Sequence, residues 1–240
     1  MKAAPALRLP ASALWPDLRA RATLPELLDA ELPASEVRKS LADLRFVNRC
    51  LGTRGSLLRA IAPHLPRGGS LLDVGCASGD VLAYLRQRLH PRLAAGLDIK
   101  ALHLSDAAQG LQGVVGDVRH LPFVAGSFDV VTASLFLHHF DAAELPAVLA
   151  ELARVARQAV VVCDLRRALV PYHFGRAAFP LLFATPVSVH DGLVSIRRGF
   201  RERELRGAFA EAGLGAIRIR RAFPYRLLAV APVGGSGRPA

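Results

Sequence analysis

The sequence predicts an α/β fold: a Rossmann-like, doubly wound sheet that is mostly parallel, with an antiparallel hairpin at its C-terminal edge and additional helices at the N-terminus. From Ser70 onward, short continuous apolar runs alternate with segments long enough to form helices. Such runs are typical of strands buried on both faces, and crossover helices account for the segments between them. The 240 residues, of which 52% are hydrophobic, suffice for one substantial core.

Two helices are expected before the sheet begins. Along 35–51, apolar residues recur at intervals of three and four and so share one helical face. A second helix is expected over 53–62. Residues 1–33 are rich in Ala, Leu, Pro and Arg with weak periodicity, which predicts a partly ordered arm. We therefore treat 1–66 as a separate N-terminal part of arm and helices.

Residues 67–232 are predicted to form the sheet domain, with parallel strands joined by right-handed crossover helices. The strands are predicted at 71–74, 93–97, 114–115, 130–135 and 160–162, and the helices around 80–89, 101–110 and 142–155.

The alternation stops after Asp164, and residues 166–200 are predicted to be an insertion on the ligand side of the sheet. Within it, 177–189 is apolar and contains Pro180 and Pro186, so we expect an irregular excursion. Two interpretations remain open: the segment covers the core, or it forms a lid over an apolar substrate.

The C-terminal part is predicted to contain one helix and the edge hairpin. The helix over 202–212 ends at Gly213, the usual residue beyond a helix C-terminus. Alternating Ile and Arg along 217–220 predict a strand that is solvent-exposed on one face, and 227–231 would pair with it. Residues 233–240 are expected to be a disordered tail.

The formal charge is +11, and residues 164–240 hold 13 Arg against five acidic residues. Such a basic third suits nucleic acid, anionic lipid or an acidic ligand, and does not decide among them.

The cysteines Cys50, Cys76 and Cys163 lack zinc-knuckle spacing, so we expect free thiols and no metal site. No run reaches the roughly 18 apolar residues of a membrane span, and no signal peptide is evident, so a cytoplasmic location without a transmembrane segment is expected.

The most informative stretch is the turn after the first strand. The strand ends in Asp73, and the small residues from Gly75 to Gly79 let the backbone approach a ligand at the start of a helix. The second strand ends at Asp98, where a carboxylate can accept hydrogen bonds from ribose hydroxyls. Asp117 follows the third strand. Because a Gly-Lys-Ser/Thr phosphate loop is missing, the pattern favours an adenosine ligand without a pyrophosphate.

Four segments stand in order along the chain: Asp73–Gly79, Gly96–Ile99, Gly116–Val118 and Phe128–Phe140. In this order they resemble the motifs of class I S-adenosylmethionine-dependent methyltransferases, in particular the small-molecule branch that serves quinone and polyketide biosynthesis. One departure is Ala77, which stands where the family usually has its middle glycine. Because alanine is nearly as small, only the fine fit of the turn is affected.

The resemblance implies S-adenosyl-L-methionine as cofactor. Asp73 would orient its ammonium group, Asp98 would hold the ribose, and Asp117 would accept from the adenine amino group, although each carboxylate could instead cap a helix or form a turn. The cofactor-binding residues implied in this way are Asp73, Gly75, Cys76, Ala77, Gly79, Asp98, Ile99, Asp117, Val118, Ala133 and Ser134.

The catalytic candidates are His138 and His139, just past the fourth strand. A phenol or enol acceptor must lose its proton, and His is suited to take it near neutral pH. The alternative is a His that packs or hydrogen-bonds at a helix start.

For the substrate, the candidates are Tyr172, His173, Arg197 and Arg198, where the two Arg would hold an acidic or enolisable head. The alternative for the Arg pair is a solvated basic surface.

Three candidate functions therefore remain. The leading one is methyl transfer to oxygen or carbon of a small, largely apolar polyketide, phenolic or quinone-like acceptor. The second is an RNA- or protein-directed methyltransferase that uses the basic C-terminal third. Nucleic acid is disfavoured, because the fourth strand is followed by Leu137-His138-His139-Phe140 and not by Asn/Asp-Pro-Pro-aromatic. The third is a binding protein without turnover. The oligomeric state is left open.

Overall fold

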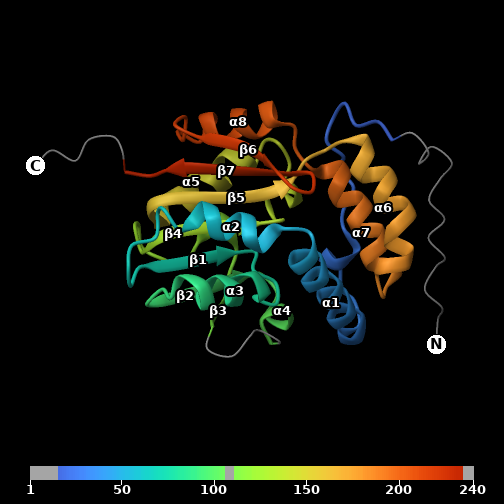
Figure 1. Cartoon of the computed structure of the whole chain (residues 1–240), viewed down its shortest axis with the longest axis horizontal. Coiled ribbons are helices and arrows are strands. Elements are labelled where there is room, and N and C mark those ends of the chain that lie inside the picture. The colour runs from blue at the N-terminus through green and yellow to red at the C-terminus, as the bar shows by residue number, and fades with distance from the viewer. Residues whose placement is uncertain (1–15, 106–110, 235–240) are drawn as a thin grey trace, which may run out of the picture.

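The computed structural model describes residues 16–105 and 111–234 and contains a seven-stranded sheet with strand order β3-β2-β1-β4-β5-β7-β6 (Figure 1). The first five strands are parallel, and β7 runs antiparallel to β5 and β6. The predicted fold class and C-terminal edge hairpin are thus confirmed. The strands are β1 Ser70–Val74, β2 Leu93–Asp98, β3 Gln112–Val115, β4 Phe128–Ser134, β5 Ala156–Leu165, β6 Arg218–Ala222 and β7 Arg226–Pro232.

The predicted N-terminal, crossover and C-terminal helices are all present, with shifts of a few residues at their ends. Parts of the expected arm, crossover helix and tail, at 1–15, 106–110 and 235–240, lie outside the described residues. The helices are α1 Ala34–Cys50, α2 Thr53–Ile61, α3 Asp80–Leu89, α4 Ala101–Ser105, α5 Leu145–Val155, α6 Leu169–Leu182, α7 Pro186–Arg198 and α8 Glu202–Glu211, with 3₁₀ turns η2 Leu27–Asp29, η3 Val118–His120 and η4 Leu137–His139.

The prediction of an irregular excursion over 177–189 is wrong, because the helices α6 and α7 form there. Pro180 lies in the last turn of α6, so the helix ends soon after the hydrogen bond that this proline removes. Pro186 lies in the first turn of α7, where a backbone N–H has no partner within the helix. The Thr185 side chain caps α7 by accepting from the Ser188 amide. The prolines therefore delimit two helices.

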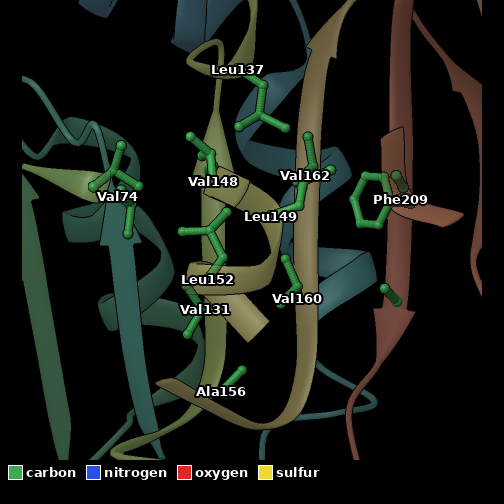
Figure 2. Close-up of a cluster of buried hydrophobic side chains, with 14 of the residues drawn as sticks. Val74, Val131, Leu137, Val148, Leu149, Leu152, Ala156, Val160, Val162 and Phe209 are labelled. Carbon is green, nitrogen blue, oxygen red and sulfur yellow. The ribbon is translucent and has the colours of Figure 1, made fainter. Parts of the chain in front are cut away.

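Apolar side chains fill both faces of the sheet, as expected for parallel strands. On one face α2 and α3 pack against strands β1, β4, β5 and β7. On the other face, Leu149 and Leu152 of α5 lie next to Val131 and Val160 of the central strands, and Phe209 of α8 belongs to the same cluster (Figure 2). Two helical layers thus hold the sheet rigid, which fixes where its strands end.

The register of the parallel strands brings their carboxyl ends to one edge of the sheet. Val74 at the end of β1 is level with Leu97 of β2 and Ala133 of β4, and Ser134 is level with Cys163 of β5. Helices α1, α6 and α7 gather beyond this edge (Figure 1). Ligands of open α/β sheets bind at this edge.

Two expectations from composition can be compared with the structure. The three cysteines are free, as predicted. Within the described ranges, no helix combines the length and apolar character needed to cross a bilayer.

We predict that Leu152→Ala lowers the free energy of unfolding by about 2–5 kcal/mol, because it leaves a cavity between α5 and the sheet where the side chain is fully buried. Urea unfolding followed by circular dichroism measures this change. The control Val124→Ala, at a side chain that is 78% exposed, is expected to shift stability by less than about 0.5 kcal/mol. Equal effects of the two substitutions would contradict the assignment of the core.

Candidate active site

A cavity of about 600 Å³ opens at the carboxyl edge of the sheet. It extends from the turn after β1 past the ends of β2 and β3, and then between α1, α6 and α7. Eight of the predicted site residues line it: Gly75, Ala77, Asp98, Ile99, Asp117, Val118, His138 and His139. The remaining predicted residues are absent from the described lining: Asp73, Cys76, Gly79, Ala133, Ser134, Tyr172, His173, Arg197 and Arg198.

The turn after β1 has the backbone shape that its small residues predict. Gly75, Ala77 and Gly79 all have positive φ, at 69°, 48° and 67°. Gly75 has a second constraint, since a Cβ placed there would lie 2.1 Å from the ring of Phe136. The Phe136 ring therefore lies directly against the Gly75 backbone.

Asp98 ties this turn to the end of β2. One carboxylate oxygen accepts from the Ala77 amide at 2.9 Å, and the other accepts from the Lys100 amide at 2.9 Å and lies 3.1 Å from Nδ1 of His103. Burial alone would raise the pKa of Asp98, but the hydrogen bonds from His103 and Lys100 outweigh it and lower that pKa. Asp98 is therefore an anion held in the cavity wall.

Beneath the turn lie buried polar atoms that have no hydrogen-bond partner among the described residues. They include Oδ1 of Asp73, Oγ of Ser134 and Nε2 of His103. Burial, followed by the charges of Asp80 and Asp98, raises the pKa of Asp73 well above its usual value. Unpartnered groups of this kind are rare in folded proteins. Of these three residues, His103 lines the cavity.

At the other end of this wall, Asp117 begins η3. Its side chain accepts from the Arg119 amide at 2.9 Å and also pairs with the Arg119 guanidinium. The hydrogen bond from that amide lowers the pKa of Asp117. Together with Gly75 and Asp98, this carboxylate follows the order that an adenosine-bearing cofactor requires along the strand ends, so the residues present fit S-adenosylmethionine.

The N-terminal segment contributes a wall of the cavity that its sequence did not predict. We call residues 18–30 the N-terminal strap. Arg21 donates to the carbonyls of Phe140 and Arg198, and both carboxylate oxygens of Asp191 accept from strap amides at 2.7 and 2.8 Å. Lys100 Nζ donates to Leu28 O at 2.6 Å and also to Ala30 O. The strap therefore joins the cofactor side of the cavity to α7.

The strap inserts Glu26 beside His138. Nε2 of His138 is 3.3 Å from Glu26, and Nδ1 is 2.7 Å from Asp164 at the end of β5. Burial favours a neutral His138, but Asp164 and Glu26 together raise its pKa to about 9. Burial would raise the pKa of Glu26, yet His138 and His139 lower it to about 2. A protonated His138 cannot accept a proton, so in this state it does not serve as the predicted general base.

His139 is more accessible, with 26% of its side chain exposed. Its Nδ1 lies 3.1 Å from Asp29 and its Nε2 lies 3.8 Å from Glu26. The rings of His138 and His139 are stacked, with centroids 4.6 Å apart. Both imidazoles therefore present Nε2 to the same carboxylate.

The predicted substrate residues lie behind the cavity wall. Arg198 is buried and donates to the carbonyls of His138, Leu24 and His139. Tyr172 is fully buried in a small cluster with Leu193 and Ile196. Arg198 thus joins the turn after β4 to the strap. Contact between these residues and a substrate stays a prediction.

The half of the cavity away from the strand ends is lined mainly by apolar side chains that the sequence analysis did not single out. They come from α1, α6 and the β6–β7 turn: Leu44, Val47, Leu51, Val170, Phe174, Phe179, Phe183 and Phe223. The helical spacing of the α1 residues predicted a buried face, but gave no sign that it faces a cavity and not the core.

Residues 71–159 match the family described as the methyltransferase domain. Over 102 residues the chain is 43% identical to the nocamycin O-methyltransferase of Saccharothrix syringae, a match covering 38% of this chain and 36% of that protein. Over 111 residues it is 32% identical to the demethylmenaquinone methyltransferase of Roseiflexus castenholzii, covering 44% and 45%. The chain thus spans less than half the length of these relatives.

Solved structures share the fold over more of the chain. The S-adenosylmethionine-dependent methyltransferase from Aquifex aeolicus has a TM-score of 0.61 at 16% identity and covers 85% of this chain and 100% of its own. The magnesium protoporphyrin IX methyltransferase from Synechocystis, solved with bound S-adenosylhomocysteine, has a TM-score of 0.54 at 19% identity, covering 86% and 91%.

Residues 71–159 thus match a methyltransferase domain, and the sheet that contains them has the topology that the motifs predicted. The named relatives belong to the branch that methylates small molecules.

We predict that Gly75→Ala lowers the free energy of unfolding by about 2 kcal/mol or more, because it combines a left-handed backbone with a clash against Phe136. The control Gly207→Ala, in α8 with open space around it, is expected to gain about 0.5–1 kcal/mol. Urea unfolding compares the two. If Gly75→Ala is as stable as the wild type, Phe136 does not pack on this turn.

Proposed function

We propose that the chain transfers a methyl group from S-adenosylmethionine to oxygen or carbon of a small, largely apolar acceptor. The observation that carries this proposal is the continuity of one cavity from the Gly75, Asp98 and Asp117 edge to the aromatic pocket between α1 and α6. One end has the shape and charges for the cofactor, and the other end has apolar surface for the acceptor. A quinone-, phenol- or polyketide-like molecule combines the needed apolar body with an enolisable oxygen.

The relatives' names support this choice of acceptor class, since one is named for nocamycin and another for demethylmenaquinone. The distribution of charge also supports it. Among the described Arg residues of 164–240, only Arg226 belongs to the cavity lining. An anionic polymer would need basic side chains along its path to the transferred methyl group. The RNA- or protein-directed alternative therefore has less support.

The cofactor supplies an electrophilic methyl group on a sulfonium. The contribution of this chain is to hold two reactants in line and to exclude water from the space between them. Asp98 would accept hydrogen bonds from ribose hydroxyls, and the small residues of the turn from Gly75 to Gly79 would let the ligand lie against the backbone. The apolar lining matters because the positive charge on sulfur disappears as the methyl group leaves, and a dry cavity stabilises the charged state less than water does.

The direct test is transfer of labelled methyl to a panel of quinols, phenols, RNA and peptides. Transfer to the quinols and phenols alone is the expected result. Labelling of RNA or peptide that falls steeply with salt would instead support the second function, and cofactor binding without any transfer would support the third.

We predict that Asp98→Ala weakens binding of S-adenosylmethionine and S-adenosylhomocysteine by about 1–3 kcal/mol, because hydrogen-bonded partners are left unsatisfied. Isothermal titration calorimetry measures this. The control Asp141→Ala, at an exposed residue, is expected to bind as the wild type does. Unchanged affinity in a folded Asp98→Ala protein would remove the cofactor assignment.

We predict that Phe174→Ala raises KM for an apolar acceptor about 5–30-fold with little change in kcat, since removing the ring forfeits about 1–2 kcal/mol of apolar contact. Phe174 lines the cavity although 61% of it is exposed, so folding should be little affected. Leu181→Ala, on the same helix but outside the described lining, is the matched control. Steady-state kinetics that show equal KM values for the two variants would place the acceptor elsewhere.

A further inference from the structure

We propose that Glu26, His138 and His139 form a binding site for a divalent transition-metal cation in the wall of the cavity. All three residues line the cavity, and their potential ligand atoms lie within 4.8 Å of one another. They come from the strap and from the turn after β4, so two distant segments complete the site.

The two imidazoles are arranged alike. Nδ1 of His138 is bound by Asp164 at 2.7 Å, and Nδ1 of His139 by Asp29 at 3.1 Å. In each ring this leaves Nε2 toward Glu26, at 3.3 and 3.8 Å. A carboxylate that holds the far nitrogen of a ligating His is the usual support of a metal site, because it fixes the tautomer and the orientation of the ring. Here both His residues have that support.

The separations also suit a cation. Two ligand atoms that lie ~2.0–2.2 Å from a tetrahedral zinc ion are ~3.4 Å from each other. Nε2 of His138 and Oε1 of Glu26 already have this spacing, at 3.3 Å. Nε2 of His139 lies 3.8 Å from the other carboxylate oxygen, Oε2, and the ligand atoms of the three residues lie within 4.8 Å of one another, so the His139 ring has to approach by up to about 1.4 Å. Side-chain rotation is enough for that, because His139 is partly exposed.

The charges of the cluster point the same way. Three carboxylates, from Glu26, Asp29 and Asp164, surround two imidazoles, and Asp164 is fully buried. A divalent cation bound by the two Nε2 atoms and the Glu26 carboxylate would lie among these groups, with Asp29 and Asp164 on the far nitrogens of the two imidazoles.

The ligand set selects the metal. Two imidazoles and one carboxylate suit Zn²⁺, Co²⁺, Fe²⁺ or Ni²⁺, whereas Mg²⁺ and Ca²⁺ prefer oxygen ligands throughout. Three protein ligands leave at least one coordination position, which faces the cavity. The use of that position rests on the proposed function: a cation there lowers the pKa of an acceptor hydroxyl, whose proton leaves to solvent before its oxygen takes the methyl group.

The experiment is titration of chelator-treated full-length protein with Zn²⁺ by calorimetry, with no cofactor or acceptor present. We expect saturable binding of one Zn²⁺ and a rise in the thermal unfolding midpoint. His139→Ala and Glu26→Gln should each weaken binding at least tenfold. His120→Ala, which removes an exposed His outside the cluster, is the matched control and should bind as the wild type does. When Co²⁺ is added in place of Zn²⁺, the bound Co²⁺ should show the visible absorption of a cobalt ion with a low coordination number.

The proposal is overturned by the absence of saturable binding, or by equal affinity in the wild type and His139→Ala. Loss of binding in Glu26→Gln alone would also overturn the three-ligand site. If Glu26→Gln fails to fold, the affinity of His139→Ala for Zn²⁺ decides between the outcomes. The His139 side chain is partly exposed, so the core does not depend on it. The assay contains no methyl transfer. Failure to bind metal and failure to transfer methyl are thus separate results.

Discussion

The carboxylate of Asp164 is the constraint on which the arrangement of the cavity depends. It lies fully buried at the end of β5 and accepts from the amides of Phe136, His138 and Leu165 and from the His138 ring. Since a buried carboxylate is costly unless its oxygens are satisfied, these bonds impose one shape on the turn after β4. That shape lays Phe136 against Gly75 and directs His138 toward the strap.

The strap covers the cavity at the carboxyl edge of the sheet. A parallel sheet supplies a row of strand ends but no cover for them, so the cavity needs a segment from elsewhere in the chain. Residues 18–30 cross this edge through backbone hydrogen bonds to Asp191 and Lys100, and side-chain bonds from Arg21. Backbone contacts of this kind depend little on sequence. Glu26, in the middle of the strap, adds a carboxylate beside the rings of His138 and His139.

The sheet and the turn after β1 could be predicted because their signals are local. A strand buried on both faces has a continuous apolar run, and a turn of small residues after Asp73 needs no knowledge of distant contacts. The same logic extends to Asp164, an acid that follows a buried strand as Asp73 and Asp98 do, and it could have been found. Glu26 could not, since the arm around it has only weak periodicity and its partners lie more than 100 residues away. The helices α6 and α7 were missed because two prolines suggested irregular chain where they mark helix ends.

Part of the positive charge has a structural explanation that changes its meaning for function. Arg21, Arg167 and Arg198 each donate to several main-chain carbonyls at the carboxyl edge, and the side chain of Arg167 is fully buried. Irregular segments leave such carbonyls without partners, and the planar guanidinium, with five donors, can satisfy several at once. These Arg residues therefore support the walls while their charge stays outside the cavity lining. Under the proposed function, selection among acceptors is left to the shape and apolar surface of the pocket, and net charge is a poor guide to what it binds.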